Sequence, residues 1–86
     1  MDETKYFVYV LELCDGRKYI GQTNNLERRL EEHRSGRSRF TRKYGVRRLL
    51  YSESYTTRSE AMRREKYLKR GKGRAWLKKK LAEQSV

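Results

Sequence analysis

The fold of this chain is decided by YFVYVLELCDGRKYIG, residues 6–21. Residues 6–13 are largely apolar and rich in β-branched and aromatic side chains, which is typical of a strand. The pair Asp15-Gly16 follows as a turn signal, because glycine adopts a positive φ without steric cost. A second strand would then run through Tyr19 to Gly21. The stretch therefore predicts a β-hairpin.

The length of the hairpin loop decides on which face of the sheet Tyr9 and Tyr19 lie. A two-residue loop would place these tyrosines on opposite faces. A three-residue loop over residues 14–16, closed by a glycine in the left-handed conformation, would pair Tyr9 with Gly21 and Tyr19 with Leu11. Both tyrosines would then share one face as diagonal neighbours. We predict the three-residue loop, with open space over Tyr9 at Gly21 that a substrate could occupy.

The composition favours a polyanionic partner. The chain has 86 residues, with 23 Lys plus Arg against 11 Asp plus Glu and a formal net charge of +12. This length suits one domain, residues 1–86, with one modest core. The excess of cations, interleaved with tyrosines, favours nucleic acid as the partner, with DNA expected first and binding that weakens as salt rises. The alternative is a merely basic, solvated surface.

Several protein classes are disfavoured by what the sequence lacks. A single cysteine excludes an internal disulfide, and no cluster resembles a metal-thiolate site. No apolar run approaches the ~20 residues of a membrane span. The N-terminus lacks the pattern of a signal peptide. We therefore expect a cytoplasmic protein with no membrane association and no obligate protein partner.

A first helix is predicted over residues 25–34. Asn24 is a suitable N-cap, and Glu27 stands three residues later at the position of a capping box. At 100° per residue, Leu26 and Leu30 define the inward stripe, while Arg28, Glu31 and Glu32 face solvent. The helix therefore has one apolar side that can pack on the sheet.

Arg29 and His33 also face inward on this helix. They are four residues apart, so they are neighbours on one face. Taken singly, His33 could be a partly buried structural histidine and Arg29 an ion pair at the edge of the core. Together they are candidates for a site.

Residues 35–46, SGRSRFTRKYGV, form a basic segment that we expect to be a loop. Cations alternate with the rings of Phe40 and Tyr44, a pattern that can grip phosphates and stack on bases. The alternative is a solvated loop with Phe40 in the core. The candidate nucleic-acid contacts are Arg37, Arg39, Arg42, Lys43 and Tyr44.

A third strand is predicted over residues 47–55, and a last basic helix over about residues 74–83. Along the strand we expect Leu49, Tyr51 and Tyr55 on one face and Leu50 on the other. The last helix would pack through Trp76, Leu77 and Leu81. With the helix between these elements, the order β-β-α-β-α-α predicts an α+β fold, a small three-stranded antiparallel sheet flanked by about three helices.

The helix before the last, over residues 58–70, carries an anomaly. Thr57 can cap it, and Gly71 is a typical stop signal. Glu65 projects into the apolar stripe that Ala61, Met62 and Leu68 form. A carboxylate there is costly unless it is paired, protonated or bound to a cation. The available partners are an inward arginine such as Arg29, which would be a purely structural ion pair, or a divalent metal.

The order of these features resembles the GIY-YIG nuclease superfamily, in particular its small single-domain members. The match covers residues 6–81, nearly the whole chain. Phe7-Val8-Tyr9 stands at the first signature triplet, with Phe7 in place of its glycine, and Tyr19-Ile20-Gly21 is the second triplet as written. The residues that carry over from the family's site are Tyr9, Tyr19, Arg29, His33 and Glu65.

The resemblance implies a metal-dependent endonuclease that hydrolyses phosphodiester bonds, with DNA as the expected substrate. Glu65 would hold one Mg²⁺ or Mn²⁺, and Arg29 would offer its guanidinium fork to the scissile phosphate. Tyr19 would assist the attack of water as a base or through a hydrogen bond, Tyr9 would share or relay the proton, and His33 would orient or protonate. The alternative is a basic nucleic-acid-binding module on the same scaffold that does not cut.

Overall fold

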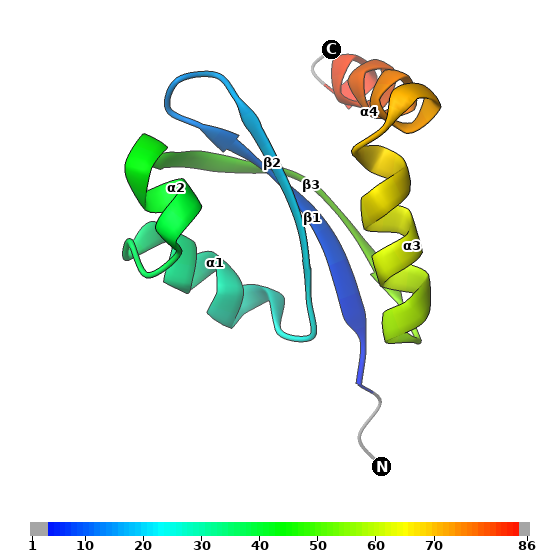
Figure 1. The fold of residues 1–86 in the computed structure, drawn as a ribbon, viewed down its shortest axis with the longest axis horizontal. Coiled ribbons are helices and arrows are strands. Elements are labelled where there is room, and N and C mark those ends of the chain that lie inside the picture. Colours follow the sequence, from blue (N-terminus) through cyan, green and yellow to red (C-terminus); the bar gives the residue numbers. More distant parts are fainter. Residues whose placement is uncertain (1–3, 85–86) are drawn as a thin grey trace.

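The computed structural model describes residues 4–84, apart from the side chain of Phe40. The elements in chain order are β1 (Tyr6–Leu13), β2 (Lys18–Thr23), α1 (Leu26–Arg34), α2 (Arg39–Tyr44), β3 (Val46–Tyr55), α3 (Arg58–Leu68) and α4 (Gly71–Gln84). The strands form an antiparallel sheet in the order β2-β1-β3. Helices α1 and α2 lie on one side of this sheet, and α3 and α4 lie on the other (Figure 1). The predicted α+β architecture is confirmed.

The hairpin has the three-residue loop that its sequence predicts. The Leu13 N–H donates to the Arg17 carbonyl at 2.8 Å, and the Gly16 N–H donates to the Leu13 carbonyl at 3.0 Å. Gly16 has a φ of +92°, which the turn requires and glycine adopts freely. Tyr9 is paired with Gly21, and Leu11 with Tyr19. Both tyrosines therefore share one face of the sheet, as predicted.

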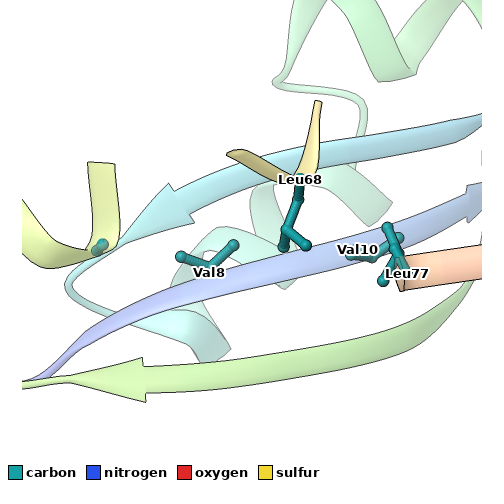
Figure 2. Close-up of a cluster of buried hydrophobic side chains, with 5 residues drawn as sticks. Val8, Val10, Leu68 and Leu77 are labelled. Atoms are coloured by element: carbon teal, nitrogen blue, oxygen red, sulfur yellow. The ribbon is translucent and has the colours of Figure 1, made fainter. Parts of the chain in front are cut away.

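The hydrophobic core lies between the sheet and the helices α3 and α4. Val8 and Val10, on the face opposite Tyr9, contact Ala61, Leu68 and Leu77, and all five side chains are buried. Figure 2 shows Leu68 from α3 and Leu77 from α4 beside the two valines of β1. Burial of each aliphatic side chain of this size contributes about 1.5–3 kcal/mol. This core holds α3 against the sheet.

Strand β3 contains a bulge that the alternation of its sequence does not reveal. Val10 is paired with Tyr51, but the next residue of β1, Leu11, is paired with Leu49. Leu50 is thus the extra residue of the bulge. As a result, Leu50 and Tyr51 both pack against the core, while Leu49 does not. The prediction that Leu49 and Tyr51 share a face was wrong, because the bulge changes the alternation between them.

The helix boundaries differ from the prediction at three places. Helix α1 begins one residue later, with Asn25 as its N-cap, whose side chain accepts from the Arg28 N–H at 3.1 Å. The basic segment is not wholly a loop, since residues 39–44 form the short helix α2. The last helix begins at Gly71 rather than at residue 74. Gly71 is therefore the first residue of α4 and not only the stop signal of the helix before it.

Gly73 explains why α3 and α4 can follow each other so closely. A Cβ at Gly73 would collide with the carbonyl group of Tyr67 in the last turn of α3. The backbone of α4 therefore packs directly on α3, where no other residue fits. The sequence predicted a loop because glycines often end helices, whereas here they allow a tight corner.

A partly buried carboxylate, that of Glu53, fixes α3 to strand β3. Glu53 accepts from Tyr51 Oη at 2.6 Å, from Tyr55 Oη at 2.8 Å, and from both Arg64 Nε and Nη2 at 2.9 and 3.0 Å. Burial alone would raise the pKa of Glu53, but these hydrogen bonds together lower it. Arg64 also stacks over the ring of Trp76 at 4.5 Å from its centroid.

Two side chains expected in the core lie elsewhere. Met62 is exposed, so the apolar stripe of α3 consists of Ala61 and Leu68. Trp76 is exposed as well: the Arg64 guanidinium lies over its ring, and the Tyr51 ring meets it in a T-shaped contact. Leu77 is buried and Leu81 packs against the core, as predicted.

No helix within residues 4–84 combines the length and the apolar character needed to cross a membrane.

Candidate active site

A row of hydrogen-bonded polar side chains is buried between the sheet and α1. Tyr9 Oη, on β1, lies 2.9 Å from His33 Nε2 in the last turn of α1. His33 Nδ1 lies 2.7 Å from Thr41 Oγ1, on α2. Exposure is 1% for Tyr9, 2% for His33 and 0% for Thr41. Three separate elements therefore hold one continuous line of exchangeable protons out of water.

His33 is held as a neutral imidazole. Burial lowers the pKa of His33, and the nearby charge of Arg29 lowers it further. A neutral ring has one nitrogen that donates and one that accepts. Since both of its neighbours are hydroxyl groups, His33 can pass a proton between Tyr9 and Thr41 without becoming charged. The prediction of an inward His33 is confirmed.

Arg29 reaches from α1 to the same phenol. Its Nε donates to Tyr9 Oη at 3.4 Å, and its Nη1 donates to Glu32 Oε1 at 3.2 Å. The hydrogen bond to Tyr9, followed by that to Glu32, raises the pKa of Arg29 above its usual range. The same pairing lowers the pKa of Glu32. Glu32 therefore does not point away to solvent as its position on the helix predicted, but anchors Arg29.

Tyr19 completes the cluster from β2. Its ring centroid lies 6.3 Å from that of Tyr9 and 5.2 Å from that of His33, with the His33 ring edge-on. A hydrogen bond to Tyr19 also contributes to the raised pKa of Arg29. Tyr19 is half-buried, unlike Tyr9. Of the two phenols, Tyr19 is the one that solvent can reach.

Burial raises the pKa of Tyr9 to about 12, although the hydrogen bond from Arg29 acts in the opposite direction. The charges of Tyr19 and Glu65 add to the increase. The Tyr9 phenol is therefore protonated near neutral pH and holds its proton firmly.

Gly21 does not leave open space for a substrate, contrary to the prediction. A Cβ at Gly21 would lie 2.6 Å from Tyr9 Oη and 2.8 Å from Tyr9 Cζ. The end of the Tyr9 phenol itself fills the volume above the glycine. Glycine is needed here because the phenol packs directly on the backbone of β2.

Glu65 approaches the cluster from the other side of the sheet. Its helix, α3, packs on the Val8 face, whereas Tyr9 faces α1. The Glu65 side chain is 22% exposed and accepts from Lys69 Nζ at 3.1 Å. It forms no ion pair with Arg29, so the structural pairing left open by the sequence is not present. Its charge nevertheless acts on Tyr9, whose pKa it helps to raise.

Two cavities show how α3 runs relative to the edge strand β2. The first, a recess of about 280 Å³, is lined by Gln22 and Thr23 at the end of β2 and by Arg58 at the start of α3, together with Arg29. The second, a groove of about 790 Å³, is lined by Tyr19 and Ile20 from the start of β2 and by Leu68 and Lys69 from the end of α3. Helix α3 therefore runs antiparallel to β2 along its edge.

Glu65 lies between the two cavities. It is seven residues after Arg58, so the two side chains leave α3 on nearly the same face, about 10 Å apart along the axis. Gly21 is likewise between the β2 residues that line the recess and those that line the groove. The middle of this edge thus carries Glu65 from one side and Tyr9 from the other.

The basic segment is not part of this cluster. Arg37, Arg39, Arg42 and Lys43 are exposed around α2. The Tyr44 ring is covered by the Arg17 guanidinium, 4.4 Å from the ring centroid, and contacted by Lys43 at 5.5 Å. The structure therefore brings together Tyr9, Tyr19, Arg29 and His33, and it keeps the five candidate nucleic-acid contacts at a separate surface.

Three residues of the site were not found from the sequence. Thr41 lies in the segment taken as a surface loop, and no local pattern indicates that it is buried. Arg58 opens α3 and gives no signal of its own. Lys69 could have been found, because a glutamate followed by a lysine four residues later is a typical helical ion pair.

The donor set fits a weakly held Mg²⁺ or Mn²⁺ rather than a preformed metal cage. Within residues 4–84 there is no group of three or more His, Cys, Asp or Glu side chains placed to hold a metal. Magnesium often binds through one or two carboxylates and completes its shell with waters and substrate phosphates. Glu65, partly exposed and paired with Lys69 alone among the ion pairs of residues 4–84, can serve as that single carboxylate.

Comparisons with known proteins find a family model and similar sequences that cover most of the chain. The family model described as the GIY-YIG catalytic domain matches residues 5–80. A UPF0213 protein of Bacillus licheniformis is 39% identical over 71 residues, which cover 81% of this chain and 73% of the relative. A UPF0213 protein of Streptococcus pneumoniae is 42% identical over 69 residues, covering 79% of this chain and 70% of the relative.

A solved structure is similar over most of the fold. The solution NMR structure of a UPF0213 protein from Bacillus halodurans has a TM-score of 0.56 and 34% identity, covering 93% of this chain and 84% of that one. The residues that the family model matches run from β1 into α4. They include Tyr9, Tyr19, Arg29, His33 and Glu65. The chain belongs to the GIY-YIG family, whose catalytic domain is of nuclease type and acts on nucleic acid.

Proposed function

We propose that residues 1–86 act as one nuclease domain, a metal-dependent endonuclease that hydrolyses phosphodiester bonds in DNA. The observation that carries this proposal is the convergence at the edge of β2. Four polar side chains form one cluster on one face, and the charge of Glu65 reaches that cluster from α3. A purely structural site would have no use for a carboxylate at that point.

Arg29 is the residue proposed to hold the scissile phosphate. It lines the 280 Å³ recess together with Arg58, so two arginines from opposite sides of the sheet border one small space. Guanidinium groups form charge-assisted hydrogen bonds with phosphate oxygens in a fixed, forked geometry. Glu32 and Tyr9 fix the orientation of Arg29 before any substrate arrives.

The two tyrosines have different roles in this proposal. Tyr19 is half-buried, so it assists the attacking water, either as a base or through a hydrogen bond. Tyr9 is 1% exposed with a pKa near 12, so it does not contact bulk water or act as a free base. Instead, Tyr9 and His33 position Arg29 and Tyr19. The contacts of His33 with Tyr9 and Thr41 allow its proton to sit on either ring nitrogen.

Glu65 is proposed as the metal ligand. A bound Mg²⁺ or Mn²⁺ would neutralise charge on the phosphate and lower the pKa of a bound water. Lys69 now holds the Glu65 carboxylate at 3.1 Å, so its ammonium group occupies the position of a competing cation. Metal binding at Glu65 therefore requires that Lys69 give up this contact.

The test compares Glu65→Gln with the matched control Glu31→Gln. Glu31 is exposed on α1 and forms no ion pair within residues 4–84. Nicking of supercoiled plasmid DNA and of a branched DNA substrate is measured with Mg²⁺, with Mn²⁺ and with EDTA. We expect Glu65→Gln to lower the rate at least about 10²-fold, while Glu31→Gln cuts like the wild type. Undiminished metal-dependent cutting by Glu65→Gln would contradict the proposal.

The ion pair between Lys69 and Glu65 favours one second candidate, a basic binding module that does not cut. It predicts salt-sensitive binding of nucleic acid with no metal-dependent product. A single experiment separates the two: wild-type protein that binds DNA but yields no product with either metal supports the binding module. Appearance of product that EDTA abolishes rejects it.

A further inference from the structure

The larger cavity has a charge distribution that the cluster of tyrosines does not explain. This groove, about 790 Å³, lies between the β1–β2 hairpin and the corner of α3 and α4 (Figure 1). Its floor includes the buried side chains Leu68 and Leu77, with Ile20 beside them. The charged residues that line it are all cationic: Arg17, Lys18, Lys69, Arg74 and Lys78.

Three of these cations are not neutralised within residues 4–84. Arg17 pairs with Asp15, and Lys69 pairs with Glu65. Lys18, Arg74 and Lys78 are exposed and form no ion pair in this part of the chain. Like charges gathered around one concave surface raise the local concentration of anions there. The groove is thus complementary to an anionic ligand that also has apolar surface.

The groove borders the candidate active site at two residues. Tyr19 lines the groove, and its ring also packs against Tyr9 and His33. Lys69 lines the groove as well, and it holds Glu65. A ligand in the groove therefore lies next to Tyr19 and to Lys69, the residue that holds the Glu65 carboxylate.

We propose that this groove holds an unpaired nucleic-acid strand that leads away from the scissile phosphate. Its phosphates contact Lys18, Arg74 and Lys78, and its bases lie against the apolar floor. A duplex keeps its bases stacked inside and its phosphates outside, so it would touch only the rim, whereas an unpaired strand offers both surfaces at once. The inference rests on the proposed nuclease function and adds the class of substrate, one with an unpaired segment beside the cut.

The test measures binding without metal, so that it does not depend on cutting. The groove variant carries Lys18→Gln, Arg74→Gln and Lys78→Gln. The control variant carries Arg34→Gln, Arg47→Gln and Arg63→Gln, which removes the same charge from exposed arginines that line neither cavity. Fluorescence anisotropy follows a thymidine oligonucleotide of about 16 nucleotides and a duplex of the same length at several salt concentrations.

The groove variant is expected to bind the single strand at least about tenfold more weakly than the control variant does. Its salt slope should fall by about 2, which is about 0.7 for each of three lost phosphate contacts on a single strand. Both variants should bind the duplex equally. Equal losses for the two variants on the single strand, or an equal loss by the groove variant on single strand and duplex, would overturn the inference.

The outcome is distinguishable from failure of the nuclease proposal. If Glu65→Gln abolishes cutting while the groove variant binds the single strand like the control, only the groove assignment fails. If the groove variant loses single-strand binding while wild-type protein never cuts, the groove assignment holds as a binding site and only the nuclease proposal fails. Circular dichroism of all variants checks that each is folded.

Discussion

Replacement of Gly21 by alanine should disrupt the site from its centre. The new Cβ would lie 2.6 Å from Tyr9 Oη, whereas ordinary van der Waals contact begins near 3.4 Å. The phenol, the strand, or both must therefore move apart by about 0.8 Å, the difference between these distances. Tyr9 is enclosed by His33, Arg29 and Tyr19, so it has little room to withdraw.

Overpacking of this kind costs about 1–3 kcal/mol. In a domain of this size, that loss lowers the melting temperature by about 5–20 °C. Displacement of a positioned group by about 1 Å can lower an enzymatic rate about 10²-fold. We therefore expect Gly21→Ala to be folded but less stable, and to be nearly inactive in the metal-dependent nicking assay.

The matched control is Gly71→Ala, since a Cβ at Gly71 would meet no atom within 4 Å. It should leave the free energy of unfolding unchanged or raise it by about 0.4–1 kcal/mol. Urea unfolding measures both variants in the wild-type background and in Tyr9→Phe. Because Tyr9→Phe removes the nearest atom, the cost of Gly21→Ala should fall in that background, where the contacts with the ring Cζ at 2.8 Å and with Tyr19 Cε1 at 3.1 Å remain. An equal cost in both backgrounds would refute the packing of Tyr9 over Gly21.

Three other changes test the supports of the site. Gly73→Ala should destabilise the protein by more than about 3 kcal/mol in urea unfolding, because its Cβ would collide with a backbone carbonyl of α3. Glu53→Gln should cost about 2–3 kcal/mol at neutral pH through its bonds to Arg64 and two tyrosines. Since the pKa of Glu53 is lowered on folding, this contribution is complete above the unfolded-state pKa near ~4.3 and is lost as pH falls through the folded-state value, so the two unfolding curves should converge in acid. Thr41→Val should leave His33 Nδ1 without its partner and cost about 1–3 kcal/mol, which Thr41→Ser should largely restore.

The local rules of the sequence were sufficient for the hairpin and for the inward pair on α1. Loop length and strand alternation fix which face Tyr9 and Tyr19 occupy, and both are local properties of residues 6–21. The spacing of four residues likewise places Arg29 and His33 together before any tertiary contact is known. The site roles of these residues remain proposals, since only their positions follow from the fold.

Long-range packing explains what the sequence did not reveal. The bulge at Leu50 belongs to the pairing of β3 with β1, and alternation along β3 alone cannot indicate it. The inner side of Gly21 is filled by a side chain from the neighbouring strand. The approach of Glu65 around the edge of β2 depends on the direction of α3, which the core contacts of Leu68 determine.

The adjacent residues Arg64 and Glu65 give α3 two flanks with different duties. They are separated by about 100° around the helix axis. Arg64 therefore binds Glu53 on β3, while Glu65 faces the edge of β2. A substitution that weakens the pair between Arg64 and Glu53 therefore also lets Glu65 move away from the edge of β2. Random substitutions that abolish cutting without unfolding the chain should therefore accumulate at Glu53 and Arg64, remote from any phosphate.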